Sequence, residues 1–359
     1  MRILIVKLGS IGDIVHTLPS LAAIRRGLPN AEISWVVERG SAEILRDNPI
    51  LDRLIEVDTK ALRRGLMSGE TLRAPRQQLR RLRASAFDLA LDFQGLLKSA
   101  SIARLSGARR IYGFSREGLR EPPSRVLLSR TVSVPKQTHV IRKGLGLVEG
   151  ALGITVPTEA RDFEFPIAVN GANQIEAEEA AAGTSGKYVI LNPGGGWPTK
   201  LWSAEKFGLL ADELWSHYGV TSLIAYGPGE VQLAETALQA SRSGKARAVT
   251  LSLKGFYALA KEAQVYVGGD TGPTHLAIAA GTPIVGLFGP TEWWRNGSPR
   301  DEDICVERND IGCRTDCHRR SCSQWICMDI DVERVFQAVT ERLKRANRIP
   351  QMETVSITV

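Results

Sequence analysis

The sequence predicts an α/β fold with two Rossmann-like, doubly wound domains that face each other across a cleft. A chain of 359 residues is long for a single core, and its hydrophobic and charged fractions of 43% and 24% are ordinary for a soluble globular enzyme. Short apolar runs alternate with helical patterns in two successive sets. Such alternation is typical of parallel sheets, whose ligands bind at the carboxyl ends of the strands.

The first set of alternating elements fills the N-terminal half. Apolar runs short enough to be buried parallel strands occur at residues 3–6, 33–37, 54–57, 87–93 and 110–112. The stretch LGSIGD (8–13) predicts a loop, and a helix with an apolar face is expected from Ile14. A helix over 140–152 ends this half, which predicts a domain of residues 1–165.

The second set follows a predicted linker, residues 166–185, which ends in an Ala- and Glu-rich run. Strands are expected at 188–192, 222–226, 248–251 and 265–267, and helices at 203–218, 230–240 and near Phe256. Together they predict a domain of residues 186–330, followed at 331–359 by a C-terminal helix (332–345) and a tail.

The ends and apolar runs of the chain indicate a cytoplasmic protein. The longest apolar stretches are interrupted by Gly, Thr or Pro, so none predicts a membrane span. The N-terminal MRILIVKLGSIGD has an apolar core of only a few residues before Lys7, which predicts a first strand rather than a signal peptide.

The stretch VYVGGDTGPTHLAIAAGTPIVGLFGPT, residues 265–291, predicts a strand, a glycine-rich loop, a short helix and a further strand. Thr271 and Gly272 are suited to cap that helix, and Pro273 to its first turn. The free N–H groups and the positive dipole end of such a helix start attract an anion, most naturally a phosphate. An ordinary crossover whose glycines serve packing is the alternative, but the polar residues crowded into this loop favour a site.

The net charge of +7 is concentrated in one segment. Residues 60–83 hold eight basic side chains and a single acid, Glu70. Such a segment can be a solvated helical face, a nucleic-acid patch, or a site for an anionic substrate or membrane surface. It contains no aromatic residue on which a base could stack, so no nucleic-acid partner is predicted.

The common nucleotide-binding motifs are missing from the sequence. It has no G-x-x-x-x-G-K-[ST], and LGSIGD lacks the glycine spacing of a dinucleotide fingerprint. The pairs Asp301/Asp303 and Asp329/Asp331 are interpreted as solvation and capping, so neither a metal site nor a cofactor is predicted. Loop residues at the carboxyl ends of predicted strands remain, and their shared position is what favours a site. They are Lys7, Ser10, Gly12, Asp13, Lys98, Arg120, Lys200, Glu230, Asp270, Thr271 and His275.

Five motifs follow one another between residue 12 and residue 291. They are GDIVHTLP (12–19), DFQGLLKSA (92–100), LREP (119–122), TKLW (199–202) and GGDTGPTHLAIAAGTPIVGLFGPT (268–291). Together they resemble the motifs of the lipopolysaccharide heptosyltransferases, glycosyltransferase family 9, and HTLP, QGLLKSA and LREP are most similar to the enzymes that add the first heptose. The resemblance implies the GT-B fold and inverting transfer of heptose from ADP-L-glycero-β-D-manno-heptose to Kdo of Kdo2-lipid A.

The resemblance also implies roles for the candidate residues. Asp13 would be the general base, because an inverting transfer needs a carboxylate to take the proton of the acceptor hydroxyl. On the donor side, Lys200 and the N–H groups of Thr271 and Gly272 would bind the diphosphate, Glu230 the ribose and Asp270 the heptose, with Gly269 and His275 completing the loop. On the acceptor side, the binding residues would be Lys7, Ser10, Gly12, Lys98 and Arg120.

Under this resemblance the basic segment has a specific interpretation. Kdo2-lipid A is anionic and lies in the inner leaflet, so Lys60, Arg63 and Arg64 would reach it and bring segment 60–83 to the membrane surface. The enzyme would then be peripheral on the cytoplasmic face of the inner membrane. A solvated amphipathic helix is an equal alternative for residues 73–83.

Four cysteines depart from the pattern of the first-heptose enzymes. Cys313, Cys317, Cys322 and Cys327 form C-x3-C-x4-C-x4-C. Similar clusters occur in enzymes that add the second heptose, which makes such an enzyme an alternative. The spacing is not that of a zinc ribbon, and free thiols in a packed loop are favoured over a structural metal. Two further alternatives are another GT-B sugar-nucleotide enzyme, such as an epimerase, and a sugar-nucleotide-binding module without catalysis.

Overall fold

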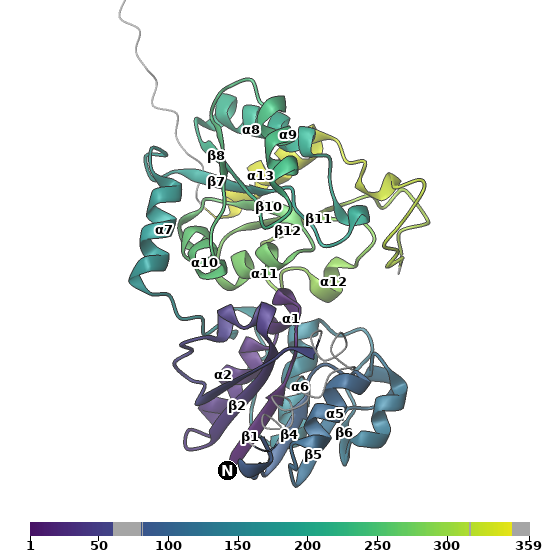
Figure 1. The fold of residues 1–359 in the computed structure, drawn as a ribbon. Coiled ribbons are helices and arrows are strands. Elements are labelled where there is room, and N and C mark those ends of the chain that lie inside the picture. The colour runs from purple at the N-terminus through teal and green to yellow at the C-terminus, as the bar shows by residue number, and fades with distance from the viewer. Residues whose placement is uncertain (60–79, 81, 316, 347–359) are drawn as a thin grey trace, which may run out of the picture. The chain divides into compact units, whose positions relative to one another are not determined.

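The computed structural model describes residues 1–59, 80, 82–315 and 317–346. The chain divides into two compact units, residues 1–168 and 169–359, and each contains a six-stranded parallel sheet (Figure 1). The prediction of two doubly wound α/β domains is confirmed. In the described part of the chain, every helix is too short or too polar to cross a bilayer.

The first unit has the strand order β3-β2-β1-β4-β5-β6. Its strands are β1 (Arg2–Val6), β2 (Glu32–Glu38), β3 (Arg53–Val57), β4 (Leu89–Asp92), β5 (Arg110–Phe114) and β6 (Arg130–Val132). Its described α-helices are α1 (Ile11–Val15), α2 (Leu18–Gly27), α5 (Leu97–Leu105) and α6 (Val140–Leu152). The strand order reverses between β1 and β4, where such sheets bind ligands beyond the strands' carboxyl ends.

Apolar runs build the core of this unit. β1 is fully buried from Ile3 to Val6, as expected for a parallel strand that is covered on both faces. α6 packs against α2, and Ile141 and Leu145 of α6 join Ala23 of α2 in one buried cluster. The loops that follow β1 and β4 are therefore anchored to well-packed, buried strands.

The chain after β1 becomes helical earlier than the sequence suggests. The stretch 8–13 predicts a loop, but α1 begins at Ile11 and contains Asp13 in its first turn. Ser10 precedes the helix, and its backbone N–H donates to Asp13 Oδ2 at 3.2 Å, as in the S-x-x-D type of helix start. α1 ends before α2, in which Pro19 has no N–H to continue the ladder.

The second unit has the strand order β12-β11-β10-β7-β8-β9. Its strands are β7 (Tyr188–Asn192), β8 (Thr221–Ala225), β9 (Ala246–Val249), β10 (Tyr266–Gly269), β11 (Ile284–Phe288) and β12 (Ile304–Glu307). Its described α-helices are α7 (Gly171–Ala181), α8 (Ala204–Tyr218), α9 (Val231–Ala240), α10 (Leu253–Glu262), α11 (Gly272–Ala279), α12 (Trp293–Asn296) and α13 (Val332–Arg345). The reversal lies between β7 and β10, so the loops that follow these two strands are neighbours.

Both ends of the second unit extend beyond the predicted boundaries 186–330. α7 lies in the stretch that was expected to be a linker, and it packs on α10. Glu176 of α7 accepts a hydrogen bond at Oε1 from the Ser252 backbone N–H, at 2.5 Å. α13, which matches the helix expected over 332–345, contributes Val335 and Val339 to the buried core of this unit. The edge strands β6 and β12 were not predicted, because few of their residues are buried and their apolar pattern is weak.

Candidate active site

Asp13 lies at the centre of a charged cluster beyond the carboxyl end of β1. Lys7, which directly follows β1, places its Nζ 3.0 Å from Asp13 Oδ1. Arg120, which lies shortly before the 3₁₀ turn η4 (Pro122–Leu127), places Nη1 3.9 Å from Asp13 Oδ2. The structure thus brings four of the predicted residues together: Lys7, Ser10, Asp13 and Arg120.

These neighbours keep the Asp13 carboxyl ionised. Burial by itself raises the pKa of this carboxyl, but the Lys7 ammonium and the Arg120 guanidinium favour the charged form and hold the pKa below its ordinary value of 3.8. The side chain is still 30% exposed. Asp13 is therefore a carboxylate at neutral pH, and part of its side chain is open to solvent.

Gln94 ties the loops after β1 and β4 to each other, a role that we did not predict although the residue lies in a quoted motif. Its Oε1 accepts the Leu8 N–H at 2.9 Å, and its Nε2 donates to the Gly9 carbonyl at 2.9 Å. Lys7 adds a bond from Nζ to the Phe93 carbonyl at 3.3 Å. The position of Lys7 beside Asp13 thus depends on the loops after both β1 and β4, the two strands between which the strand order reverses.

Lys98 belongs to a separate cluster. Its Nζ lies 2.8 Å from Glu38 Oε1 at the end of β2 and 2.9 Å from Thr59 Oγ1. Burial raises the pKa of the Glu38 carboxyl, but hydrogen bonds from Lys98 and Thr59 lower it to a net value below 4.5. The other predicted acceptor contacts, Lys60, Arg63 and Arg64, lie outside the described residues.

In the second unit, Asp270 is held by three side chains. Lys200 Nζ lies 2.6 Å from Oδ2, His275 Nε2 lies 3.2 Å from Oδ1, and Asn296 Nδ2 donates to Oδ2 at 3.4 Å. Burial raises the pKa of the Asp270 carboxyl, yet His275 and Lys200 lower it far more, to well below 3.8. Lys200 and Asp270 are only 12% and 6% exposed, so the pair is a buried one. Asn296 was not among the predicted site residues.

The loop between β10 and α11 forms a turn with its hydroxyls bonded inward. Thr274 Oγ1 donates to the Gly269 carbonyl, and the hydroxyls of Thr271 and Thr274 lie 3.1 Å apart. Gly269 permits close packing, because a Cβ there would lie 3.1 Å from the Lys200 carbonyl oxygen. Thr271 caps α11 in extended backbone, and the first N–H groups of a helix, here beginning at Gly272, are of a kind that can bind an anion.

Glu230 lies at the start of α9 and accepts two backbone N–H groups. Gly195 N donates to Oε1 at 3.0 Å and Gly227 N to Oε2 at 2.8 Å. The carboxylate occupies the space that a Cβ at Gly194 would need, so a larger residue there would displace the Glu230 side chain. Glu230 thus joins the loops after β7 and β8 and keeps acceptor capacity on both oxygens.

Trp197 adds an aromatic platform beside the Lys200 ammonium. Lys200 Nζ lies 4.3 Å from the centre of the Trp197 ring, and the Arg320 guanidinium carbon lies 5.0 Å from it. The sequence motifs indicated Lys200 but neither of its two neighbours. Because rings attract cations over their faces, Trp197 helps to set the direction of the Lys200 side chain.

Comparisons with known proteins agree with the motifs. Residues 76–326 match glycosyltransferase family 9 (heptosyltransferase). The chain is 32% identical to lipopolysaccharide heptosyltransferase 1 of Pseudomonas aeruginosa, in an alignment covering 90% of this chain and 88% of that protein. It is 30% identical to the protein of the same name from Escherichia coli K12, with coverages of 81% and 89%. Its fold is similar to that of E. coli heptosyltransferase WaaC with ADP, with a TM-score of 0.77 at 24% identity over 95% of this chain and 100% of that one, which supports the predicted GT-B fold.

Proposed function

Because the chain belongs to glycosyltransferase family 9, the heptosyltransferases, we propose that it transfers L-glycero-D-manno-heptose from ADP-heptose to Kdo of Kdo2-lipid A. The enzyme is a glycosyltransferase of lipopolysaccharide inner-core biosynthesis. The observation that carries the proposal is the ionised, partly exposed carboxylate of Asp13 between Lys7 and Arg120. The two cations beside this carboxylate can attract an acceptor that carries negative charge, and the carboxylate can then take a proton from its hydroxyl.

Asp13 is the general base of the proposed reaction. Its carboxylate takes the proton of the acceptor hydroxyl while that oxygen attacks the anomeric carbon, and the bond from this carbon to the diphosphate oxygen breaks. Attack from the face opposite to the leaving ADP inverts the anomeric carbon. Lys7 and Arg120 bind the acceptor's carboxylates or phosphates, with Ser10 and Gly12 shaping the same loop.

The second unit binds the donor in this proposal. The Lys200 ammonium and the free N–H groups at Thr271 and Gly272 stabilise the charge that develops on the leaving diphosphate. Asp270 accepts from heptose hydroxyls, and Glu230 accepts from the ribose with the lone pairs that its two backbone partners leave open. His275 orients the Asp270 carboxylate, and Gly269 allows the loop before the helix to pack closely.

The acceptor is proposed to be presented at a membrane. Lys98 and the basic segment 60–83, with Lys60, Arg63 and Arg64, supply cations that suit the phosphates of a lipid A headgroup. The enzyme then works in the cytoplasm, peripherally on the inner membrane. The homologues named lipopolysaccharide heptosyltransferase 1 support the lipopolysaccharide acceptor.

Transfer assays with purified ADP-heptose test the function. Kdo2-lipid A and its mono-heptosylated form are offered as separate acceptors, and product is detected by mass. Turnover of the bare acceptor is expected, with little of the mono-heptosylated one. Preference for the mono-heptosylated acceptor would instead support the second-heptose enzyme that the cysteine pattern suggests. Thermal stabilisation by UDP but not by ADP would contradict the donor assignment.

A further inference from the structure

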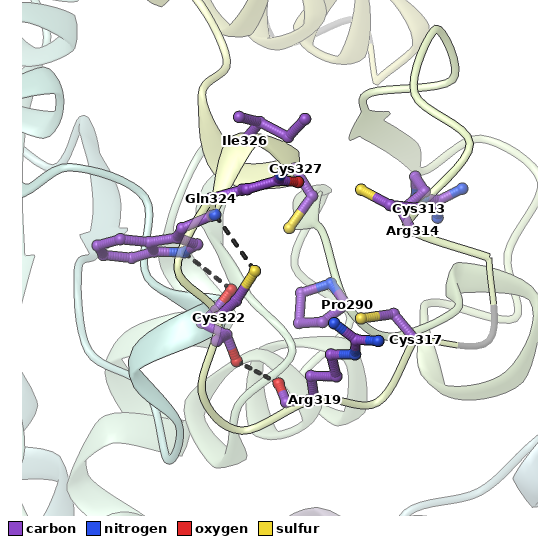
Figure 2. A pocket seen from close by; sticks show the side chains of 11 residues that line it. Pro290, Cys313, Arg314, Cys317, Arg319, Cys322, Gln324, Ile326 and Cys327 are labelled. Carbon is purple, nitrogen blue, oxygen red and sulfur yellow. Dashed lines mark hydrogen bonds between the residues drawn. The ribbon is translucent and has the colours of Figure 1, made fainter.

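Four of the five cysteines line one cavity in the second unit. Cys313, Cys317, Cys322 and Cys327, here called the thiol cluster, surround a space of 180 Å³. Figure 2 shows the four sulfur atoms pointing into this space from different parts of its wall. The chain between Cys313 and Cys322 supplies one side, the 3₁₀ turn η7 (Ile326–Met328) supplies another, and Pro290 after β11 lies between them.

Two further features of the cavity favour negative charge on sulfur. The Trp325 backbone N–H donates to Cys322 Sγ at 3.3 Å, a hydrogen bond that favours negative charge on this sulfur. Arg314 lines the cavity and is buried. Its Nη2 lies 2.5 Å from Glu307 Oε2 and 3.6 Å from Glu292 Oε2, whereas its Nε has no hydrogen-bond partner among the described residues. A buried guanidinium N–H without a partner is costly, and a thiolate would satisfy it.

The four thiols share one small cavity. Several thiolates cannot share one small cavity without a cation between them. A chain with two backbone turns in the left-handed region, His318 at φ 44° and Trp325 at φ 45°, encloses this space.

We propose that the thiol cluster binds one thiophilic divalent metal ion of the zinc type as a tetrathiolate. Four sulfur ligands are the set that zinc and iron prefer. In the described residues no three ligand-type groups stand close enough to hold an ion as they lie, so binding requires the four sulfur atoms to move closer together within the cavity. Each thiol releases its proton to solvent, and the Arg319 guanidinium, which also lines the cavity, offsets part of the remaining negative charge.

The site is joined to the loop that carries Lys200. Thr199 Oγ1 donates to the Arg319 carbonyl at 2.7 Å, and Trp325 Nε1 donates to the Thr199 carbonyl at 3.1 Å. Arg319 and Trp325 lie between the cysteines of the thiol cluster along the chain. A bound ion would therefore restrict the two residues to which Thr199 is hydrogen-bonded. A consequence for donor binding rests on the proposed function of Lys200, whereas the metal site itself does not.

Metal analysis of the full chain, purified without a metal-affinity step and under reducing conditions, tests the site. After incubation with Zn²⁺ and removal of excess by gel filtration, one zinc per chain is expected. Cys322→Ser combined with Cys327→Ser should lower zinc affinity at least about tenfold in competition with a chromophoric chelator. Cys305→Ser is the matched control, because Cys305 lies on β12 outside the cavity, and it should retain full binding.

A variant that does not fold is replaced by Cys313→Ser, which alters an exposed cysteine and should weaken zinc binding in the same direction. Less than about one-tenth of a zinc per chain, or equal zinc in the double variant and in Cys305→Ser, would overturn the site. All of these measurements are independent of transfer activity, so failure of the proposed function leaves them interpretable.

Discussion

The Lys7 ammonium lies 3.0 Å from Asp13 Oδ1, at the point where the strand order of the first unit reverses. This ion pair has two consequences for the proposed reaction. It keeps the base ionised, and it places a cation where an anionic acceptor must arrive. The acceptor's own negative charge can compete for Lys7 and free the carboxylate to accept a proton.

Replacing Asp13 by Asn should lower kcat by about 10²–10⁴-fold, because the amide cannot take the acceptor proton. The affinity for ADP should stay within about twofold, which calorimetry can measure, since the proposed donor residues lie in the other unit. Asp162→Asn, at an exposed carboxylate of the same unit, is the control and should keep full turnover. A near-normal kcat in Asp13→Asn would remove this residue from the role of base.

Replacing Lys7 by Met should move the acidic limb of the pH profile of kcat/KM to higher pH. Burial raises the pKa of Asp13 and Lys7 lowers it, so loss of the Lys7 charge leaves the carboxyl with a higher pKa that is protonated earlier as the pH falls. Arg109→Met removes an exposed arginine that pairs with Asp88 at 3.8 Å, and its profile should be unchanged. An unshifted limb in Lys7→Met would show that another group sets it.

Replacing Asp270 by Asn should cost about 3–5 kcal/mol of unfolding free energy at pH 7, because Lys200 then remains as a buried charge without its partner. Urea denaturation measures this difference. Since the folded-state pKa lies below 3.8, the contribution of Asp270 is complete above that pH and should shrink only as the pH falls below it. The exposed Asp301→Asn in the same unit is the control, with unchanged stability, and an equal loss there would refute the assignment.

Replacing Lys60, Arg63 and Arg64 together by Ala should raise KM for Kdo2-lipid A and spare KM for ADP-heptose. Each cation near an anionic surface contributes about 1 kcal/mol, so the combined effect should exceed tenfold at low salt and decline as salt is added. The control variant replaces three exposed cations elsewhere in the first unit by Ala: Arg109, Lys136 and Arg161. Equal changes for both substrates, or in both variants, would argue against contact through the basic segment.

Replacing Trp325 by Phe should weaken ADP binding by about 2–5-fold, because the bond from Trp325 Nε1 to the Thr199 carbonyl is lost next to Lys200. Calorimetric titration with ADP measures the change. Trp215→Phe on α8 is the control and should bind ADP as the wild type does. Unchanged affinity in Trp325→Phe would mean that the loop of the thiol cluster does not influence the donor site.

The strand and helix patterns predicted most of the fold because buried parallel strands are continuous apolar runs. β7, YVILN, is buried at every position, and its apolar run predicts a strand over 188–192 as the structure has it. The edge strands β6 and β12 were not predicted. The start of α1 was not predicted either, because residues 8–13 were assigned to a loop although Ser10 and Asp13 have the S-x-x-D spacing of a helix start.

The sequence by itself determined the two α/β units and the motif residues of the candidate site, because local periodicity and motif spacing are properties of the chain. Only the tertiary structure decided which side chains meet. Lys7 and Arg120 are far apart in sequence yet both contact Asp13, whereas Lys98 pairs with Glu38 instead. The thiols, spaced unlike a zinc ribbon, line one cavity because η7 returns the chain to the wall at Pro290. Contacts across such distances depend on sheet order and packing, and spacing along the chain does not encode them.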